Sequence, residues 1–256
     1  MEEFVVHATH KAKPFKALLS VIKNLLGDVN VRFDARGIRV AGVDAEKVTV
    51  TELLIRNLSS YSCLQDCVIG VYPESLYKLF RAVGNSDEVE FSVLKSAPKT
   101  LLVKISNPER FSTTVAKFES IELPLEDVKI PTVEYDAMLT IPTADLQRAL
   151  QEISHISKTA WLGFEGRELI LKAESPQGHI NIKMEEAEST MVWRKSPDYS
   201  EQHQYFIKYI EKFIKPEVSK TVDVYFRKDY PLTLQYNDDA NIGVLQFRIA
   251  PVKLNS

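Results

Sequence analysis

The segment KAKPFKALLSVIKNLL, residues 11–26, decides the fold, because its apolar residues recur at steps of three and four. Phe15, Leu18, Ile22 and Leu25 fall on one face of a helix with this spacing, and the lysines of the segment fall on the other face. The sequence therefore predicts an amphipathic helix that has one buried side and one basic side.

Three further segments share this helical spacing, at about residues 73–83, 143–157 and 204–215. Most of the remaining chain alternates apolar and polar residues, as in Val29–Phe33 and Val222–Phe226. That period of two is typical of half-buried strands. The sequence therefore predicts four helices among many strands.

The helical segments repeat along the chain. The first aligns with the third at a constant shift of 131 residues, which places Phe15 against Leu146, and the second aligns with the fourth at a shift of 134, which places Leu76 against Ile210. Similarity at a fixed period indicates a duplicated unit. We expect two similar domains, each with the order strand, helix, strands, helix, strands.

A linker separates the two repeats. It covers residues 118–135, contains Pro124 and Pro131, and has no sustained period of either kind. Its five aliphatic residues indicate that it lies against a protein surface rather than in solvent. The predicted domains are therefore residues 1–117 and residues 136–256.

Composition excludes several protein classes. The chain has 256 residues, of which 45% are hydrophobic and 26% are charged, with only 9 glycines and 2 cysteines. Disordered, collagen-like and disulfide-stapled chains differ from this composition. We expect a soluble intracellular protein, because the sequence lacks a signal-peptide layout and a membrane-length apolar run. Cys63 and Cys67 are expected to be reduced thiols with packing roles.

The formal net charge is −3, from 32 basic and 35 acidic residues. This near-neutral total conceals nine cations on the predicted helices. Without them 23 basic residues face 35 acidic ones, a net charge of −12. A lysine on one exposed helix face is ordinary, but its repetition on four equivalent helices indicates a surface for nucleic-acid phosphates. The nine cations are Lys13, Lys16, Lys23, Lys78, Arg81, Arg148, Lys208, Lys212 and Lys215.

The sequence contains no motif of the GxxxxGK[ST], GxGxxG, HExxH or GxSxG type. Its five histidines lack the spacing of metal ligands, and no nucleophile, base and orienting group come together. We therefore expect a binding protein with no catalytic residues, no metal and no cofactor.

Five segments carry a resemblance to a known family: GIRVAGVDAEKV (37–48), LYKLFRAVGNSDEVEF (76–91), KIPTVEYDAMLTIPTADLQRALQEISHIS (129–157), YPLTLQY (230–236) and LQFRIAPVK (245–253). Together they resemble the proliferating cell nuclear antigen family of DNA sliding clamps. The similarity covers essentially the whole chain in order.

The resemblance implies an α+β clamp fold of two similar domains, each with two helices packed on antiparallel sheets. It also implies a homotrimeric ring that encircles double-stranded DNA and acts as a polymerase processivity factor in replication and repair. Its partners would be DNA polymerase, a clamp loader and other proteins with clamp-binding peptides. The implied location is the nucleus, a site of viral DNA replication, or the cytoplasm of an archaeon.

The resemblance also assigns roles to residues. The helix cations would line the hole. Client peptides would dock on the connecting loop and the C-terminal segment, at Val43, Lys47, Val128, Ile130, Pro131, Tyr230, Pro231, Ala250, Pro251 and Val252. Subunits would pair a strand over Glu109, Arg110, Phe111, Ser112, Thr113, Thr114, Val115, Ala116 and Lys117 with a neighbour's strand over Gly178, His179, Ile180, Asn181, Ile182, Lys183 and Met184.

Departures from the family pattern keep alternatives open. Lys47 stands where many relatives have His, the linker is about two residues longer than in animal and yeast members, and the tail lacks an acidic ending. These features suggest a viral, protist or archaeal source, or a paralogue. The alternatives are a subunit of a heterotrimeric replicative or checkpoint clamp, a monomeric viral processivity protein and, more distantly, an enzyme acting on DNA.

Overall fold

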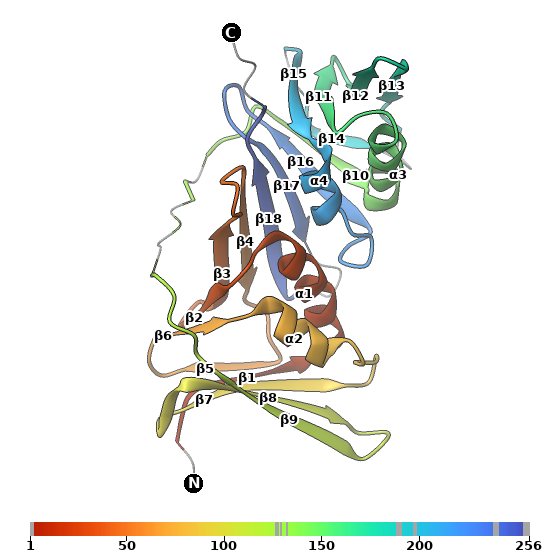
Figure 1. Ribbon diagram of the computed structural model, residues 1–256. Helices are drawn as coiled ribbons and strands as arrows, with labels where there is room; N and C mark the ends of the chain where they lie inside the picture. Colours follow the sequence, from red (N-terminus) through yellow and green to blue (C-terminus); the bar gives the residue numbers. More distant parts are fainter. Residues whose placement is uncertain are drawn as a thin grey trace. The chain divides into compact units, whose positions relative to one another are not determined.

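The computed structural model describes residues 3–125, 128, 130–131, 133–187, 191–196, 199–237 and 241–252. The chain divides into two compact units, and Figure 1 shows its elements in sequence colours. Unit 1 contains residues 1–45, 51–129 and 240–245, and unit 2 contains residues 46–50, 130–239 and 246–256.

Unit 1 contains two helices, each of which has a proline in its first turn, where the missing N–H costs nothing. The helices are α1 (Lys13–Leu25) and α2 (Pro73–Phe80). The strands that lie in this part of the chain are β1 (Phe4–Lys11), β2 (Val29–Asp34), β3 (Gly37–Val43), β4 (Thr49–Ile55), β5 (Ser60–Cys63), β6 (Cys67–Val71), β7 (Glu88–Leu94), β8 (Ala97–Asn107) and β9 (Ser112–Glu119).

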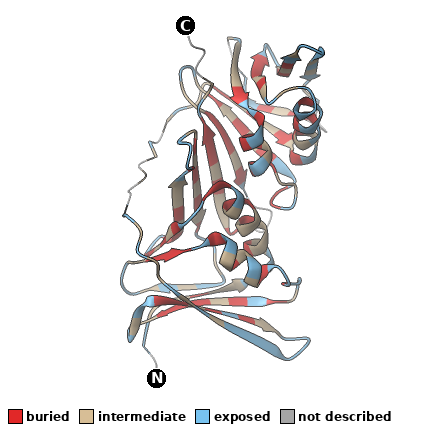
Figure 2. Cartoon of the chain, in the orientation of Figure 1, coloured by how far each residue is buried: buried red, intermediate tan, exposed pale blue. Residues whose placement is uncertain are grey.

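The strands of unit 1 form two sheet layers, in the orders β5-β1-β7-β8-β9 and β4-β3-β2-β6. Helices α1 and α2 lie side by side and pack on each other. Their apolar sides meet the first sheet through Phe15, Phe80 and Phe91, whose ring centroids lie 4.9 to 6.1 Å apart. Burial of these aromatic rings fixes the helix pair and leaves its opposite side in solvent (Figure 2).

Unit 2 contains the other two helices, α3 (Thr143–Ser154) and α4 (Ile207–Phe213). The strands that follow the linker are β10 (Ala137–Pro142), β11 (Thr159–Glu165), β12 (Glu168–Ser175), β13 (Gly178–Met184), β14 (Val192–Lys195), β15 (Glu201–Phe206), β16 (Thr221–Phe226), β17 (Leu232–Asn237) and β18 (Gly243–Ile249).

The strands of unit 2 also form two layers, in the orders β13-β12-β11-β15 and β14-β10-β16-β17-β18. Helices α3 and α4 pack on each other. The buried ring of Phe213 on α4 stacks on Tyr236 of β17 and Phe247 of β18, at centroid distances of 4.8 and 5.0 Å. This stack anchors α4 to its sheet.

The predicted duplication is confirmed. Adding nine to each strand number of the first half converts the sheet orders β5-β1-β7-β8-β9 and β4-β3-β2-β6 into β14-β10-β16-β17-β18 and β13-β12-β11-β15. The helices occupy equivalent places in the element order. The α+β class and the four helices on antiparallel sheets are therefore as the sequence predicts.

The expected start of the fourth helix, at residue 204, is wrong. Residues 204–206 belong to β15, where Gln204 and Phe206 pair with Trp161 and Thr159 of β11. Phe206, predicted on the buried side of the helix, is 37% exposed, because it precedes the first turn. At residues 204–206, backbone pairing with β11 therefore decides the structure, and the helical spacing of the apolar residues does not.

Candidate functional site

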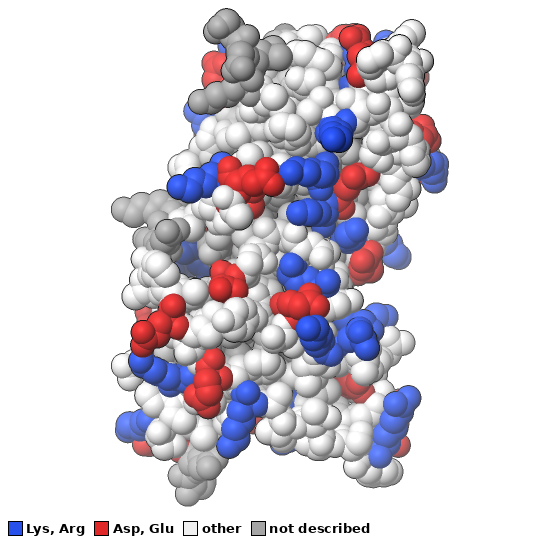
Figure 3. Space-filling view, viewed as in Figure 1, with Lys and Arg blue, Asp and Glu red and all other residues white. Residues whose placement is uncertain are grey.

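The helix pair of unit 1 presents five of the nine predicted cations on the side that faces away from the sheets. Figure 3 shows basic side chains gathered over α1 and α2, with acidic groups between them. These cations are Lys13, Lys16, Lys23, Lys78 and Arg81.

The five cations differ in how strongly they are held. Lys16 donates from Nζ to the carbonyl oxygen of Val83 at 3.3 Å. Lys23 is only 20% exposed, because its Nζ lies 3.3 Å from Oε2 of Glu74 and 4.6 Å from the Tyr77 ring centroid. Glu74 is shared with Lys78, whose Nζ lies 4.0 Å from Oε1. Glu74 is thus one negative charge shared by two lysines, so the helix pair of α1 and α2 keeps a net positive charge.

Unit 2 carries the other four cations. Arg148 on α3 is exposed and lies 3.6 Å from Asp145, one turn earlier. Lys208 and Lys212 are one turn apart on α4, and Lys215 lies just past its end. The backbone N–H of Lys215 donates to the hydroxyl of Tyr236 at 2.8 Å, which fixes where α4 stops.

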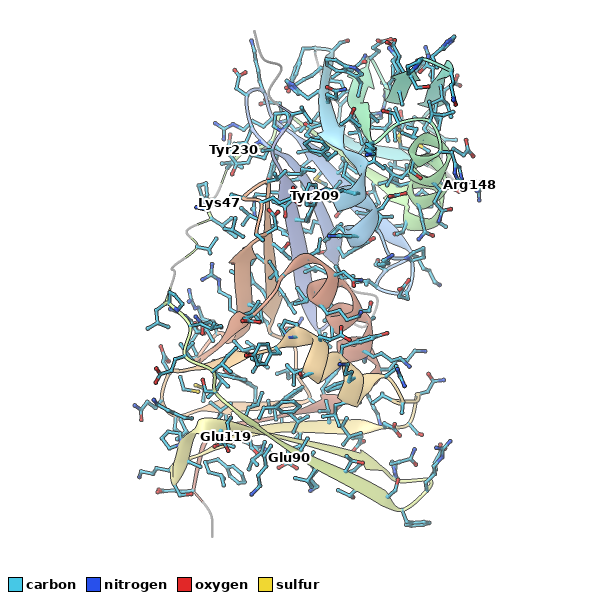
Figure 4. The ribbon with its side chains drawn as sticks, in the orientation of Figure 1. Lys47, Glu90, Glu119, Arg148, Tyr209 and Tyr230 are labelled. Atoms are coloured by element: carbon cyan, nitrogen blue, oxygen red, sulfur yellow. The ribbon has the colours of Figure 1, made fainter. Side chains whose placement is uncertain are left out.

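Tyr209 gives α4 a feature that the charge pattern does not show. Its ring is buried, with 3% exposure, and lies beneath Lys208 and Lys212, whose Nζ atoms are 4.7 and 5.7 Å from the centroid. An aromatic face attracts cations at this distance. Tyr209 therefore holds two lysines in place from below, and Figure 4 labels it on α4.

Glu46, in the loop between β3 and β4, also acts on these lysines. Its Oε1 lies 3.0 Å from Nζ of Lys208. The Tyr209 hydroxyl and the Lys208 ammonium lower the pKa of Glu46, and Glu46 in turn raises the pKa of Lys208. The charge pattern predicts Lys208 as one of the phosphate-contacting cations, and the structure adds that it is ion-paired with Glu46. Because 162 residues separate the partners, helix periodicity could not find this pair.

The predicted client-peptide residues of unit 2 lie on three short segments. Lys47 is exposed and takes a left-handed backbone conformation, with φ 56°. The next residue, Val48, accepts a hydrogen bond from the N–H of Ala250 at 3.0 Å, and the N–H of Val252 donates to the carbonyl oxygen of Gln204 at 2.7 Å. The C-terminal segment is thereby tied to the loop of Lys47.

The remaining client residues of unit 2 lie in the turn between β16 and β17 and in the segment before β10. Tyr230 lies in the turn between β16 and β17, with its ring 6.3 Å from Tyr135 and 5.7 Å from the guanidinium of Arg227 (Figure 4). Pro231 follows it, half-buried. Ile130 is half-buried and Pro131 is exposed, both in the segment before Tyr135.

Two client residues belong to unit 1. Val43 ends β3 with 41% exposure. Val128 lies on the linker, and its carbonyl oxygen accepts a hydrogen bond from Arg39 of β3 at 2.9 Å. Asn30 of β2 binds the carbonyl oxygen of Pro124 in the same way. The linker is thus held to β2 and β3 by its backbone at Pro124 and Val128, whereas the side chain of Leu125 is 72% exposed.

The two predicted interface strands are both edge strands. β9 ends the order β5-β1-β7-β8-β9, and β13 ends the order β13-β12-β11-β15. The predicted strand over 109–117 starts later than expected, because Glu109, Arg110 and Phe111 form the turn from β8. Val115 on β9 is 59% exposed, and Phe111, in the turn that precedes the strand, is 96% exposed.

Within the described residues, no group of three or more His, Cys, Asp or Glu side chains is placed to hold a metal ion. None of the described helices has the length and hydrophobicity needed to span a bilayer. Cys63 and Cys67 are free thiols.

Comparison with known proteins agrees with this architecture. Residues 7–127 match the N-terminal domain of proliferating cell nuclear antigen, and residues 129–252 match its C-terminal domain. The chain is 26% identical over 252 residues to a probable DNA polymerase sliding clamp of Paramecium bursaria Chlorella virus 1, covering 95% of both chains. It is 24% identical to the proliferating cell nuclear antigen of Dictyostelium discoideum, over 94% of this chain and 96% of that one.

These matches span both halves of the chain and agree with its duplicated fold. Clamps of this family are not enzymes; they keep polymerases on DNA during replication. The chain belongs to the proliferating cell nuclear antigen family of DNA sliding clamps, as a divergent member whose function is that of a DNA polymerase sliding clamp.

Proposed function

We propose that this sliding clamp is a homotrimer that closes around double-stranded DNA through β9 and β13. The support comes from the repeat. Strands β18 and β4 are neighbours in the sheet order. Within unit 1, Gly243 of β18 lies so close to β4 that a β-carbon there would meet the carbonyl oxygen of Leu54. Within unit 2, the N–H of Ala250 donates to the carbonyl oxygen of Val48. Their repeat equivalents are β9 and β13, and both end their sheets.

An unpaired strand edge leaves a row of backbone N–H and C=O groups open to another chain. Pairing β9 of one copy with β13 of the next would satisfy both edges in the way that β18 and β4 already do. A head-to-tail contact of this kind is heterologous, and it closes only as a ring. The proposed interface is the set 109–117 together with 178–184.

The nine helix cations are proposed to contact the DNA backbone without reading sequence. Lysine and arginine side chains that meet phosphates release counterions, and such contacts are individually weak and exchangeable. This is compatible with sliding. The acidic remainder of the chain disfavours DNA on other surfaces.

The client-peptide residues named above are proposed to dock short motifs of the polymerase, the clamp loader and other replication and repair proteins. Tyr230, Pro231 and Ile130 supply apolar surface, and Lys47 supplies the exposed charge at its margin. A chain with these partners would act where DNA is replicated, in a nucleus or at a site of viral DNA replication.

The decisive experiment combines mass with topology. Native mass spectrometry at micromolar concentration should give three copies of a 29.1 kDa chain. After loading, the protein should stay on nicked circular DNA at a salt concentration that strips it from the same DNA once linearised. Only monomer by mass, with equal loss from both DNAs, would favour the monomeric viral type. A monomer that forms trimers only with a second protein would favour the heterotrimer.

A further inference from the structure

Arg248 of β18 is a buried cation without a carboxylate partner among the described residues. Its side chain is 8% exposed, and its Nη2 donates to Oε1 of Gln246 at 2.7 Å. Its Nε and Nη1 have no hydrogen-bond partner in the same part of the chain. A buried charge without acceptors is costly, so this guanidinium is expected to receive a partner in the working state of the protein.

Strand geometry decides which side of the sheet Arg248 occupies. Phe247 stacks on Phe213 of α4, so its side chain points to the helix side. Successive side chains on a strand point to opposite faces. Arg248 therefore lies on the face away from α4 and its cations, and DNA on the helix side cannot be its partner.

A polar network braces Arg248 from one side. Gln246 accepts the Arg248 N–H and donates to Gln235 of β17 at 2.5 Å. Gln235 donates to Asn237 at 3.2 Å, and Asn237 donates to Asp223 of β16, also at 3.2 Å. Three side chains of the network thus separate the carboxylate from Arg248, and that carboxylate also accepts a hydrogen bond from the Thr140 hydroxyl at 2.7 Å. The network orients the guanidinium without neutralising it.

The surroundings of Arg248 are those of the proposed client-peptide site. Ala250, one of the proposed client-peptide residues, is two residues further along the chain, directly after the end of β18. On the neighbouring strand β17, Thr233 accepts a hydrogen bond from the hydroxyl of Tyr135 at 3.3 Å, and Tyr135 lies against Tyr230. Arginine and tyrosine are the residue types enriched at energetic centres of protein interfaces.

We propose that Arg248 is a specificity-determining residue of the client-peptide site, and that it selects client peptides carrying an aspartate or glutamate whose carboxylate accepts hydrogen bonds from the guanidinium. The inference rests on the proposed peptide docking and adds to it a charge requirement. A peptide is favoured as the occupant because Arg248 lies in the strand that leads directly into the C-terminal segment, and that segment already pairs with neighbouring backbone through Ala250 and Val252.

The test uses fluorescent 16-residue peptides with two aromatic residues on one helical turn. Each peptide carries one Glu at a different flanking position and has a matched partner with Gln there. Anisotropy titrations with the full chain should find a position where Glu binds about tenfold or more tightly than Gln, as a charge-assisted hydrogen bond supplies. In Arg248→Met this ratio should fall below about twofold, with the Gln peptide bound about as well as before.

Two further variants secure the result. Arg248→Lys keeps the positive charge but lacks the planar guanidinium, so the ratio of Glu-peptide to Gln-peptide affinity should be intermediate. This variant replaces Arg248→Met in the test if the Met variant fails to fold. Lys95→Met should leave the Glu preference unchanged, because Lys95 is exposed in the turn between β7 and β8, outside the proposed client-peptide site and the network. A Glu preference that survives in Arg248→Met, or equal binding of Glu and Gln peptides to the native chain, would overturn the inference alone. If no peptide binds, including the Gln set, the proposed docking function fails as well.

Discussion

Nζ of Lys208 lies 3.0 Å from Oε1 of Glu46, which joins a predicted DNA-contacting helix to the loop that carries Lys47. Both side chains are more than half exposed to solvent, so the pair contributes little to the stability of the fold. The pKa of Glu46 lies below its ordinary value, so the ion pair is complete at neutral pH and is lost only as the pH falls through that lowered pKa. The ion pair matters for DNA binding, because it engages Lys208, one of the cations proposed to contact phosphates.

Glu46→Gln should strengthen DNA binding. The change frees Lys208 for a phosphate, so the slope of log K against log salt should steepen by about 0.9 for each subunit in which Lys208 then meets a phosphate. The measurement is a salt titration on a short duplex. Glu211→Gln is the matched control, because it removes the same charge from α4 but breaks no ion pair among the described residues. An equal change in both variants would assign the effect to net charge rather than to Lys208.

Replacing Lys16, Lys78 and Lys212 together with Gln should weaken loading and sliding without unfolding the chain. All three lie on the helix sides away from the cores, so the unfolding midpoint should stay nearly constant. The salt slope should fall by about 0.9 for each phosphate that the protein no longer neutralises. A control variant with Gln at Lys95, Lys99 and Lys104, which are exposed on β8 or in the turn before it, has the same charge change and should behave like the native chain. Unchanged polymerase stimulation in the helix variant would contradict the assignment of these cations.

Periodicity predicted the elements that bury one whole side. The spacing of Phe15, Leu18 and Ile22 places α1 within two residues of its observed ends, because a helix of thirteen residues is long enough for the apolar spacing to recur several times. It fails at α4, which has only seven residues. There Phe206 fits a helical spacing as well as a strand spacing, and only its pairing with Thr159 of β11 decides between them.

The candidate site was predictable where it depends on one segment and not where distant segments meet. The cations of α1 and α4 can be read from the sequence, whereas the pairing of Lys208 with Glu46 cannot. The same holds for Arg248: alternation with Phe247 indicates its face, but its burial and its brace through Gln246 depend on the neighbouring strand. Interactions of that kind require the folded sheet.

Cys67 should react slowly with thiol reagents in the native chain. Burial is the main cause that raises its pKa to about 11. At pH 8 only about one Cys67 thiol in a thousand is then ionised, and the thiolate is the reactive form. The rate of reaction with Ellman's reagent should therefore be roughly a hundredfold below that of the unfolded chain, and should rise about tenfold per pH unit to near pH 10. The reaction rate of Cys67 alone is measured in a Cys63→Ser variant. A rate that does not rise above pH 8 would contradict the raised pKa of Cys67.

Gly70→Ala should detach the start of the connecting segment. A β-carbon at Gly70 would lie 2.2 Å from the carbonyl oxygen of Ile121, on backbone that is also bonded to Gly70 at 3.0 Å. Backbone cannot yield as a side-chain tip can, so a loss of about 1–3 kcal/mol is expected in chemical denaturation, with faster hydrogen exchange at Ile121. Gly84→Ala is the control, because nothing lies within 4 Å of its β-carbon, and it should change stability by less than about 0.5 kcal/mol. Equal stability of the two variants would show that Ile121 is not packed on β6.

Val115→Glu should convert the proposed trimer into folded monomers. Val115 lies in the edge strand β9 and is 59% exposed in the single chain, so the substitution costs the fold little. In the ring it would place a charge at the pairing of β9 with a neighbour's β13, where burial of an unpaired carboxylate is costly. Native mass spectrometry should show monomer, with circular dichroism unchanged. Leu64→Glu is the control, since Leu64 is 76% exposed in the turn between β5 and β6 and belongs to neither β9 nor β13, and that variant should stay trimeric. A trimeric Val115→Glu would move the subunit interface away from β9, because no buried strand pairing there could accept the charge.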